Sequence, residues 1–274
     1  MSLQLVLAAL TLGTFISSCS SDDSDDSGAP EKEYQSEDGS PKTRIGMFGS
    51  DGKRLAQFGQ KKFFYQSNGL LDSISDVYSN GYGYEWKFSK DMKSADMVCH
   101  DADGRLDWKS QSYVYTYNRA GYLSSIANNL KETNVDIATG KTTCTYDKSG
   151  HLQSLDTPKI LYVLTWVNDT ITDIIETKDK TGSTYKRKLH FDYNNGELPN
   201  KSRQYPTIID SWDYPIYFHL GLFGDGPAFL PLNVTCDMNN NSPWKAQCEY
   251  TLNNDGTIAK CRWLGSVVMA YQYK

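Results

Sequence analysis

One short phrase recurs along the chain and limits what the chain can fold into. It reads "YTYNRAGYLSSI" at Tyr115–Ile126 and "CTYDKSGHLQSL" at Cys144–Leu155. Alternating Tyr-x-Tyr places both aromatic side chains on one face of a β-strand. Asn or Asp followed three residues later by Gly is typical of a type I turn with a bulge, in which Gly takes the left-handed position. Each phrase therefore predicts one corner of a β-hairpin.

Looser copies of this phrase stand elsewhere in the chain. The corner glycines of all copies are Gly52, Gly69, Gly104, Gly121, Gly150, Gly196 and Gly256. The intervals between consecutive corner glycines range from 17 to 60 residues, whereas a stacked solenoid keeps a nearly constant period. We therefore expect a mainly β fold, in which an antiparallel meander forms a curved sheet or an incomplete barrel.

The expected strands are apolar on one face and polar on the other, as in a sheet with one wet side. Tyr113, Tyr115 and Tyr117 share one face, for example. The opposite faces carry too many charges for the lipid-facing band of a membrane barrel. The stretch Ile160–Val167, "ILYVLTWV", is apolar on both faces, so we expect another element to cover it.

One short helix is expected near residues 209–223, and it is the candidate cover. Its apolar side chains step by three or four positions, which is helical spacing. They are Ile209, Trp212, Ile216, Leu220 and Phe223. The glycines and prolines of "GLFGDGPAFLPL" then end the helix.

The chain begins with a targeting segment. Leu3–Ile16 is apolar and, at 14 residues, fits the core of a signal peptide better than a membrane span. It is followed by "FISSC", which resembles the lipobox of bacterial lipoproteins. Residues 1–18 are thus predicted to be a lipoprotein signal peptide, and Cys19 the lipidated residue. The alternative is an ordinary signal peptide with an incidental cysteine, and the opening "MSLQLV" lacks the usual Lys or Arg.

Residues 19–41 are predicted to be an acidic, disordered tether. Between residues 20 and 41 stand eight acidic side chains and one lysine, with almost no apolar side chain to build a core. Because the whole chain carries −5, residues 42–274 carry only +2. These residues are expected to form a single β-meander domain. A nearly neutral domain without a basic run has no electrostatic footprint for nucleic acid.

The corners, the lipobox and "GLFGDGPAFLP" at Gly221–Pro231 together resemble a family of Bacteroides-type lipoproteins of unknown function with a porin-like fold. The likeness spans most of residues 44–274. The corners also look like the tyrosine-aspartate repeats of large secreted shell proteins, although those keep a more regular period. The resemblance implies a fold and a lipid-anchored location at the outer membrane. Because the stretch from Cys19 to Asp23, "CSSDD", resembles the acidic surface-export signal of Bacteroides-type lipoproteins, we expect the cell surface; a periplasm-facing location is the alternative. The family resemblance implies no catalytic residues.

The remaining motifs favour structural roles. Cys248 and Cys261 face each other across a hairpin if its loop has four residues, which makes a disulfide possible; a three-residue loop places them on opposite faces, and buried thiols are the alternative. His100–Gly104 lacks the ligands of a calcium loop. His190 and Asp192 share a strand face without a nucleophile motif nearby. We therefore predict no metal, no cofactor and no catalytic residue.

An aromatic cluster is the best indication of a ligand. The candidate binding residues are Trp212, Tyr214, Tyr217, Phe223 and Phe229. Aromatic faces can stack on sugar rings, but large aromatics also dominate protein cores. The leading hypothesis is a non-enzymatic, lipid-anchored surface protein that binds a ligand such as glycan. The alternatives are an accessory subunit that binds an outer-membrane protein and, less favoured, a hydrolase.

Overall fold

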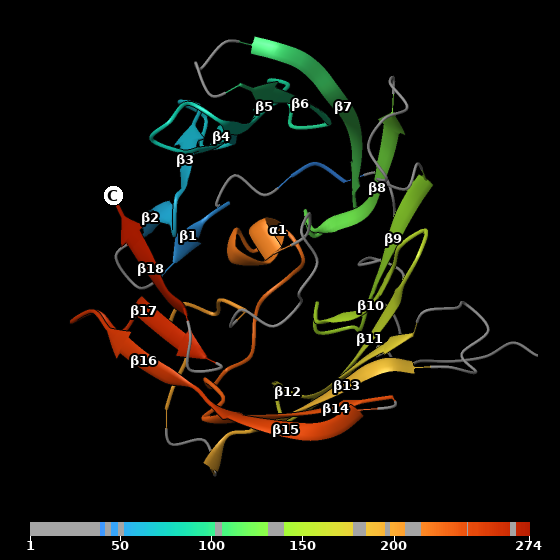
Figure 1. Ribbon diagram of the computed structural model, residues 1–274, viewed down its shortest axis with the longest axis vertical. Helices are drawn as coiled ribbons and strands as arrows, with labels where there is room; N and C mark the ends of the chain where they lie inside the picture. Colours follow the sequence, from blue (N-terminus) through green and yellow to red (C-terminus); the bar gives the residue numbers. More distant parts are fainter. Residues whose placement is uncertain are drawn as a thin grey trace, which may run out of the picture.

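A computed structural model describes residues 39–41, 45–48, 52–101, 106–130, 140–177, 185–194, 198–205, 215–239, 241–263 and 267–274. The described part is mainly β, as predicted. Its strands are β1 (Met47–Phe48), β2 (Lys53–Phe58), β3 (Lys61–Tyr65), β4 (Leu71–Val77), β5 (Gly83–Phe88), β6 (Ser94–His100), β7 (Leu106–Tyr117), β8 (Leu123–Leu130), β9 (Gly140–Tyr146), β10 (Leu152–Asp156), β11 (Leu161–Val167), β12 (Thr170–Thr177), β13 (Tyr185–Asp192), β14 (Asn233–Met238), β15 (Asn241–Gln247), β16 (Glu249–Leu252), β17 (Ile258–Trp263) and β18 (Val267–Tyr273). One helix, α1 (Pro215–His219), lies inside the ring of strands (Figure 1).

The strands form a nearly closed antiparallel barrel. From β2 to β15 each strand pairs with the next one along the chain, and so do β16, β17 and β18. β18 pairs in turn with β2, where Tyr271 lies opposite Phe58. Only Cys248 separates β15, which pairs with β14, from β16, which pairs with β17. The ring therefore continues through this bend in the chain.

The predicted hairpin corners are confirmed wherever the structure describes them. In the corner at Asn118, the Asn118 N–H donates to the Tyr122 carbonyl and the Gly121 N–H donates to the Asn118 carbonyl. Tyr122 also donates its N–H to the Asn118 side chain at 3.0 Å. Gly121 has a φ of 81°, which costs glycine little and other residues more. The same backbone pattern recurs at Gly69, Gly150 and Gly256. Gly104, Gly196 and residues 49–51 of the Gly52 corner lie outside the described residues.

The corners of an antiparallel meander alternate between the two ends of the barrel. The corners with Gly69, Gly121, Gly150 and Gly256 all lie at one end, which we call the clamped end. The corner between Tyr78 and Tyr82 lies at the other end, which we call the tyrosine end. Most copies of the recurring phrase therefore belong to one end of the molecule.

The connection from β13 to β14 folds back into the barrel and fills it near the clamped end. We call its described parts, residues 198–205 and 215–232, the plug. Its buried apolar side chains belong to the same core as the inner faces of the strands, and the inward-facing Tyr113, Tyr115 and Tyr117 are all buried, as predicted. Backbone hydrogen bonds join Leu220 of the plug to Gly46, and Leu222 to Leu123.

Helix α1 ends where a glycine allows the chain to turn back. The Leu222 N–H donates to the Tyr217 carbonyl and the Gly221 N–H donates to the Phe218 carbonyl, and Gly221 has a φ of 68°. This is the Schellman arrangement of a helix C-terminus. The helix lies within the predicted range 209–223, although residues 206–214 lie outside the described part. Among the described residues, no helix is long and apolar enough to cross a bilayer.

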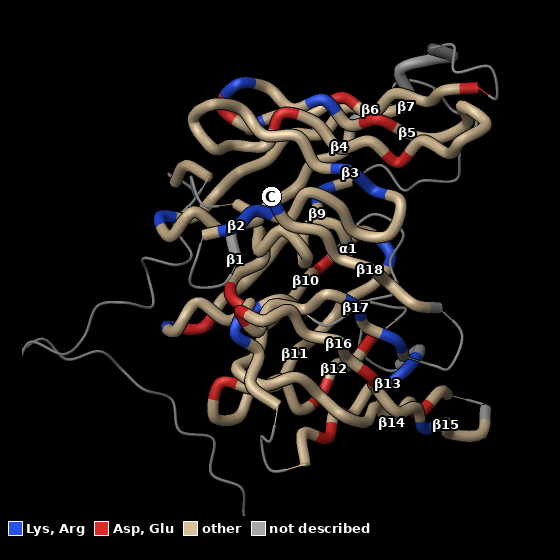
Figure 2. Tube along the Cα trace, turned by 90° about the vertical axis from the view of Figure 1, so that its left-hand side faces the viewer, with Lys and Arg blue, Asp and Glu red and all other residues tan. Residues whose placement is uncertain are grey.

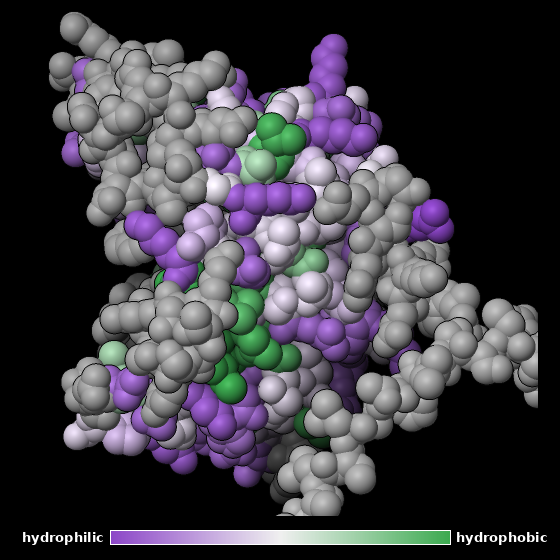
Figure 3. Space-filling model, turned by 90° about the vertical axis from the view of Figure 1, so that its right-hand side faces the viewer, coloured by the Kyte–Doolittle hydropathy of each residue, from purple (hydrophilic) through white to green (hydrophobic). Residues whose placement is uncertain are grey.

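The prediction that both faces of Ile160–Val167 are covered was wrong. Tyr162 and Leu164 point into the barrel and are buried, but Val163 is 38% and Val167 50% exposed on the outer face. Figure 3 shows a compact hydrophobic area on the side of the barrel to which β11 belongs, with hydrophilic surface above and below it. Elsewhere, charges of both signs are scattered along the strands (Figure 2). The helix covers the inside of the sheet only.

The predicted signal peptide and most of the tether lie outside the described residues. The tether's last residues do contact the domain, because the Gly39 N–H donates to the Tyr117 carbonyl at 3.0 Å. A Cβ on Gly39 would lie 1.6 Å from the Asn118 carbonyl oxygen. The chain thus reaches the clamped end slightly before residue 42.

Candidate functional site

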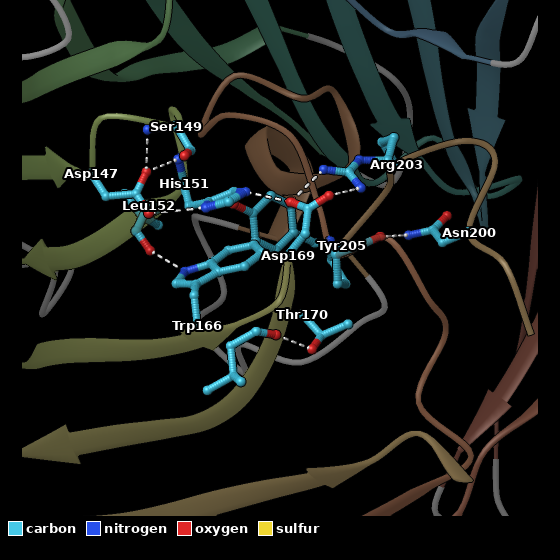
Figure 4. Close-up of polar contacts among 12 residues, drawn as sticks. Asp147, Ser149, His151, Leu152, Trp166, Asp169, Thr170, Asn200, Arg203 and Tyr205 are labelled. Carbon is cyan, nitrogen blue, oxygen red and sulfur yellow. Dashed lines mark hydrogen bonds and ion pairs between the residues drawn. The ribbon is translucent and has the colours of Figure 1, made fainter. Parts of the chain in front are cut away.

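A histidine between two carboxylates marks the clamped end (Figure 4). His151 Nδ1 lies 3.0 Å from Asp147 Oδ2, and His151 Nε2 lies 2.5 Å from Asp169 Oδ1. Asp147 opens the corner that contains Gly150, and its other oxygen accepts the backbone N–H groups of Ser149 and His151. The corner chemistry therefore fixes both His151 and the carboxylate beside it.

The second carboxylate is held by an arginine of the plug. Arg203 donates from Nη1 to Asp169 Oδ2 at 2.6 Å and from Nη2 to Oδ1 at 2.8 Å. This two-point hydrogen bonding by Arg203 holds the pKa of Asp169 below its usual value. Asn168 and Asp169 have φ values of 48° and 64°, as the two central residues of a tight hairpin turn require. The turn between β11 and β12 thereby presents Asp169 to both partners.

A tryptophan ring orients the histidine. The Trp166 and His151 rings stack with their centroids 4.2 Å apart and an interplanar angle of 11°. Trp166 also donates its Nε1–H to the Leu152 carbonyl at 2.8 Å, and Tyr205 of the plug packs edge-on against it. Trp166 is therefore held by a hydrogen bond and by Tyr205, and its stacked ring limits the rotation of His151.

Backbone hydrogen bonds complete the attachment of the plug. The Ala228 N–H donates to the Asp169 carbonyl, and the Gly226 N–H donates to the Arg203 carbonyl. The buried Asn200 donates its side-chain N–H groups to the carbonyls of Gln204 and Pro227. We call Asp147, His151, Trp166, Asp169 and Arg203 the clamp, because they join two hairpin corners to the plug.

The clamp is suited to holding charges rather than to catalysis. Both ring nitrogens of His151 contact carboxylates, so neither is available to take a proton from a substrate. Of the nearby hydroxyl residues, Ser149 contributes its backbone N–H to the cluster, and the Thr170 hydroxyl donates to the Val167 carbonyl. In the described ranges, no group of three or more His, Cys, Asp or Glu residues is arranged to hold a metal ion.

Sequence reasoning missed the clamp. Asp147 and His151 stood in a recognised corner, and Asn-Asp at 168–169 is a known signal of a tight turn. Arg203, however, is 34 residues from Asp169, and only the path of the plug brings them together. His190, which we weighed with Asp192, instead contacts Asp173 of the neighbouring strand at 3.1 Å and is exposed.

Two of the five predicted aromatic ligand residues are core residues. Tyr217 and Phe223 are 3% and 0% exposed, and the Tyr217 hydroxyl lies 2.8 Å from that of Tyr115. Phe229 is partly buried and pairs with Pro199. Trp212 and Tyr214 lie outside the described residues. The core interpretation therefore accounts for Tyr217 and Phe223.

Cys248 and Cys261 are both buried thiols. The loop between β16 and β17 has three residues, because Asn253 exchanges backbone hydrogen bonds with Thr257 and Gly256. A bulge after Thr251 then places Tyr250, not Cys248, opposite Cys261. The four-residue loop that would align the two cysteines was thus the wrong alternative. Burial raises the pKa of Cys248 to about 11, which makes its thiol unreactive near neutral pH.

The tyrosine end exposes aromatic side chains. Tyr78 and Tyr82 close the corner between β4 and β5 and are each 48% exposed. The Tyr82 ring packs edge-on against Tyr84 with centroids 6.2 Å apart, and a hydrogen bond with Tyr82 raises the pKa of Tyr84 to about 12. Nearby, Lys61 and Asp76 form an ion pair of 2.6 Å.

Comparison with solved structures identifies the fold. A porin-like protein from Bacteroides uniformis superposes with a TM-score of 0.56, at 14% identity over 78% of this chain and 89% of that one. A porin-like protein from Bacteroides vulgatus superposes with a TM-score of 0.45, at 11% identity over 80% of this chain and 98% of that one. A TcdB2–TccC3–Cdc42 complex superposes with a TM-score of 0.32, at 13% identity over 73% of this chain and 11% of that one. Only the first TM-score is high enough to indicate a common fold. No protein-family model and no curated protein matches the sequence.

Proposed function

We propose that this chain is a non-enzymatic, lipid-anchored protein of the bacterial outer membrane that faces the cell surface and binds polysaccharide. The observation that carries the proposal is the plug. The chain fills its own barrel near the clamped end with buried apolar side chains, which favours binding over conduction through the barrel. The buried thiols and the carboxylate-bound His151 give no support to a hydrolase.

The lipid anchor rests on the sequence before the domain. The apolar Leu3–Ile16 and the "FISSC" that ends in Cys19 support lipidation, and the acidic run that follows supports export to the surface. We expect Cys19→Ala to abolish partitioning into the detergent phase, while a Ser18→Ala control still partitions. Retention of the Cys19→Ala variant in the detergent phase would contradict the anchor. Protease treatment of intact cells would then separate surface exposure from a periplasm-facing location.

The binding role is tested directly with the full chain and a panel of purified polysaccharides. Retarded migration in native gels that contain one of them is the expected result. If no polysaccharide retards the protein, the binding role as proposed is wrong.

One observation favours a second function, that of an accessory subunit. Val163 and Val167 are exposed on the outer face of β11, within the side of the barrel that carries the hydrophobic area of Figure 3. Exposed apolar patches often mark protein contacts. A Val167→Asp variant that loses a co-purifying outer-membrane protein, while a Thr165→Asp control on the same face keeps it, would support this role.

A further inference from the structure

Three residue pairs on the inner face of the β4–β5 hairpin become more exposed toward the corner of the hairpin. Ile74 lies opposite Trp86, Asp76 lies opposite Tyr84, and Tyr78 closes the corner with Tyr82. Because side chains alternate along a strand, these pairs share one face. Trp86 is 8% exposed, whereas Tyr78 and Tyr82 are each 48% exposed. The Tyr82, Tyr84 and Trp86 rings succeed one another at centroid distances of 6.2 Å.

Unsatisfied amide groups lie deeper on the same wall of the barrel. The register places Trp86 opposite Met97 and Met97 opposite Gln111. Gln111 is 1% exposed, and its Oε1 accepts hydrogen bonds from the Tyr113 hydroxyl and from Asn128 Nδ2. Gln111 Nε2 and Asn128 Oδ1 have no partner among the described residues. An unsatisfied buried polar group destabilises a fold, and a hydroxyl group, which both donates and accepts, could satisfy both.

We propose that this inner wall of β4–β7 at the tyrosine end is the polysaccharide-binding site, an inference that rests on the function proposed above. Tyr78, Tyr82 and Tyr84 offer ring faces and edges for the apolar faces of sugar rings. Gln111 lies two strands from Trp86, a separation of about 10 Å at the usual strand spacing. A few polar groups within an aromatic surface are typical of ligand sites. The extent of the wall suits several linked sugar rings better than one small molecule.

The charges of the wall favour a neutral polysaccharide. Lys61 and Asp76 neutralise each other in a 2.6 Å ion pair, so no uncompensated charge is available from this pair to bind a uronic acid. An extended peptide is a poorer fit, because peptides commonly bind by adding a strand to a free sheet edge. β4, β5 and β6 are each paired on both sides.

The test compares variants of the full chain in native gels that contain xylan, mannan, a β-glucan or polygalacturonate. We expect the Tyr78→Ala/Tyr82→Ala double variant to lose at least tenfold in affinity for the neutral polysaccharide that retards the wild type. The double Tyr→Phe variant should keep most of the affinity, because the rings carry the contact. The control is Phe64→Ala, which removes an aromatic ring that is 44% exposed and lies opposite Ser73 on the outer face.

The outcomes separate the site from the function. If the wild type and the double Tyr→Ala variant bind a neutral polysaccharide equally, the site is wrong and the binding function stands. If the wild type binds only polygalacturonate, the proposed neutral ligand is wrong. If the wild type binds none of the four, the proposed function fails together with its site. Melting curves of each variant show whether a loss of binding reflects a loss of the fold.

Discussion

The two ends of the barrel use the same kind of hairpin corner and differ in what the corner contacts. At the clamped end, Asp147 opens a corner and also binds His151, while Asp169 links His151 to Arg203 of the plug. At the tyrosine end, Tyr78 and Tyr82 close a corner with the same backbone hydrogen bonds. Their side chains, however, extend toward solvent. A corner thus supplies a fixed position, and its side chains determine whether that position serves stability or recognition.

The difference is also visible in the packing around two glycines. Gly224 of the plug has a φ of 93°, and a Cβ there would lie 2.5 Å from the Gly150 carbonyl oxygen. Gly59, in the corner between β2 and β3 at the tyrosine end, has a φ of 58°, and its Cβ would meet only the end of the Met269 side chain, at 3.9 Å. Gly224 therefore needs to be glycine for both backbone conformation and space, whereas Gly59 needs to be glycine for conformation alone.

The largest expected effect comes from Gly224→Ala. Positive-φ strain and a clash with backbone together should lower the free energy of unfolding by about 3 kcal/mol. For a domain of this size that is roughly 6–12 °C in melting temperature. The matched variant Gly59→Ala should cost only about 1 kcal/mol. Thermal unfolding followed by circular dichroism measures both. Equal losses in the two variants would mean that the close approach of Gly224 to the Gly150 carbonyl adds nothing to the cost of positive φ.

The next effect concerns pH and the inner tip of the plug. His219, at the end of α1, is 1% exposed; its Nδ1 lies 3.5 Å from the Tyr271 hydroxyl, and its ring packs on Phe58. Burial, aided by the charge of Lys61, lowers the pKa of His219 to about 3. As the pH falls below about 6.5, His219 therefore takes up a proton in the unfolded chain but stays neutral in the folded chain. Stability is fully present above pH 6.5 and falls by about 2 kcal/mol between pH 6.5 and 5.

Urea unfolding at pH 7.5, 6 and 5 measures this loss. The free energy of unfolding of a His219→Leu variant should fall less between pH 7.5 and pH 5 than that of the wild type, by about 2 kcal/mol. The control is His190→Leu, which removes a histidine whose side chain is 59% exposed, and its decline should match that of the wild type. A His219→Leu variant as acid-sensitive as the wild type would show that His219 is accessible to protons in the folded protein.

The corners and inner faces were predictable because their chemistry is local. An Asx residue and a glycine at a fixed offset determine a turn, and period-two alternation placed Tyr113, Tyr115 and Tyr117 on the buried face. The clamp was not predictable, because Arg203 reaches Asp169 only through the fold of the plug. The density of aromatics near residues 205–229 pointed to a ligand, yet the described members of that cluster largely fill the barrel. A single bulge after Thr251 was enough to change the register of Cys248 and Cys261.

Arg203→Met should have a smaller effect than the two changes above. It removes the ion pair with Asp169 and keeps an apolar stem. Because the Asp169 side chain is 42% exposed, solvent screening limits the expected loss to about 1 kcal/mol at pH 7. The folded-state pKa of Asp169 is depressed, so this contribution is present above about pH 4 and is lost as the pH falls below that value. Urea unfolding at pH 7 and pH 3 should therefore show a difference between wild type and variant at pH 7 only.

The smallest expected effect on stability, and the sharpest contrast between the ends, belongs to Tyr82→Ala. Tyr82 is 48% exposed, and its removal costs an edge-on contact with Tyr84 and the hydrogen bond that raises the pKa of Tyr84. Exposed substitutions of this kind usually change stability by about 0.5 kcal/mol or less. A spectrophotometric titration should show the pKa of Tyr84 moving down toward its ordinary value, while the urea midpoint hardly changes. A loss of 2 kcal/mol would instead give Tyr82 a structural role like that of the clamp residues. With stability unchanged, the half-exposed Tyr82 does little for folding, and a loss of polysaccharide binding in the same variant would identify what it does.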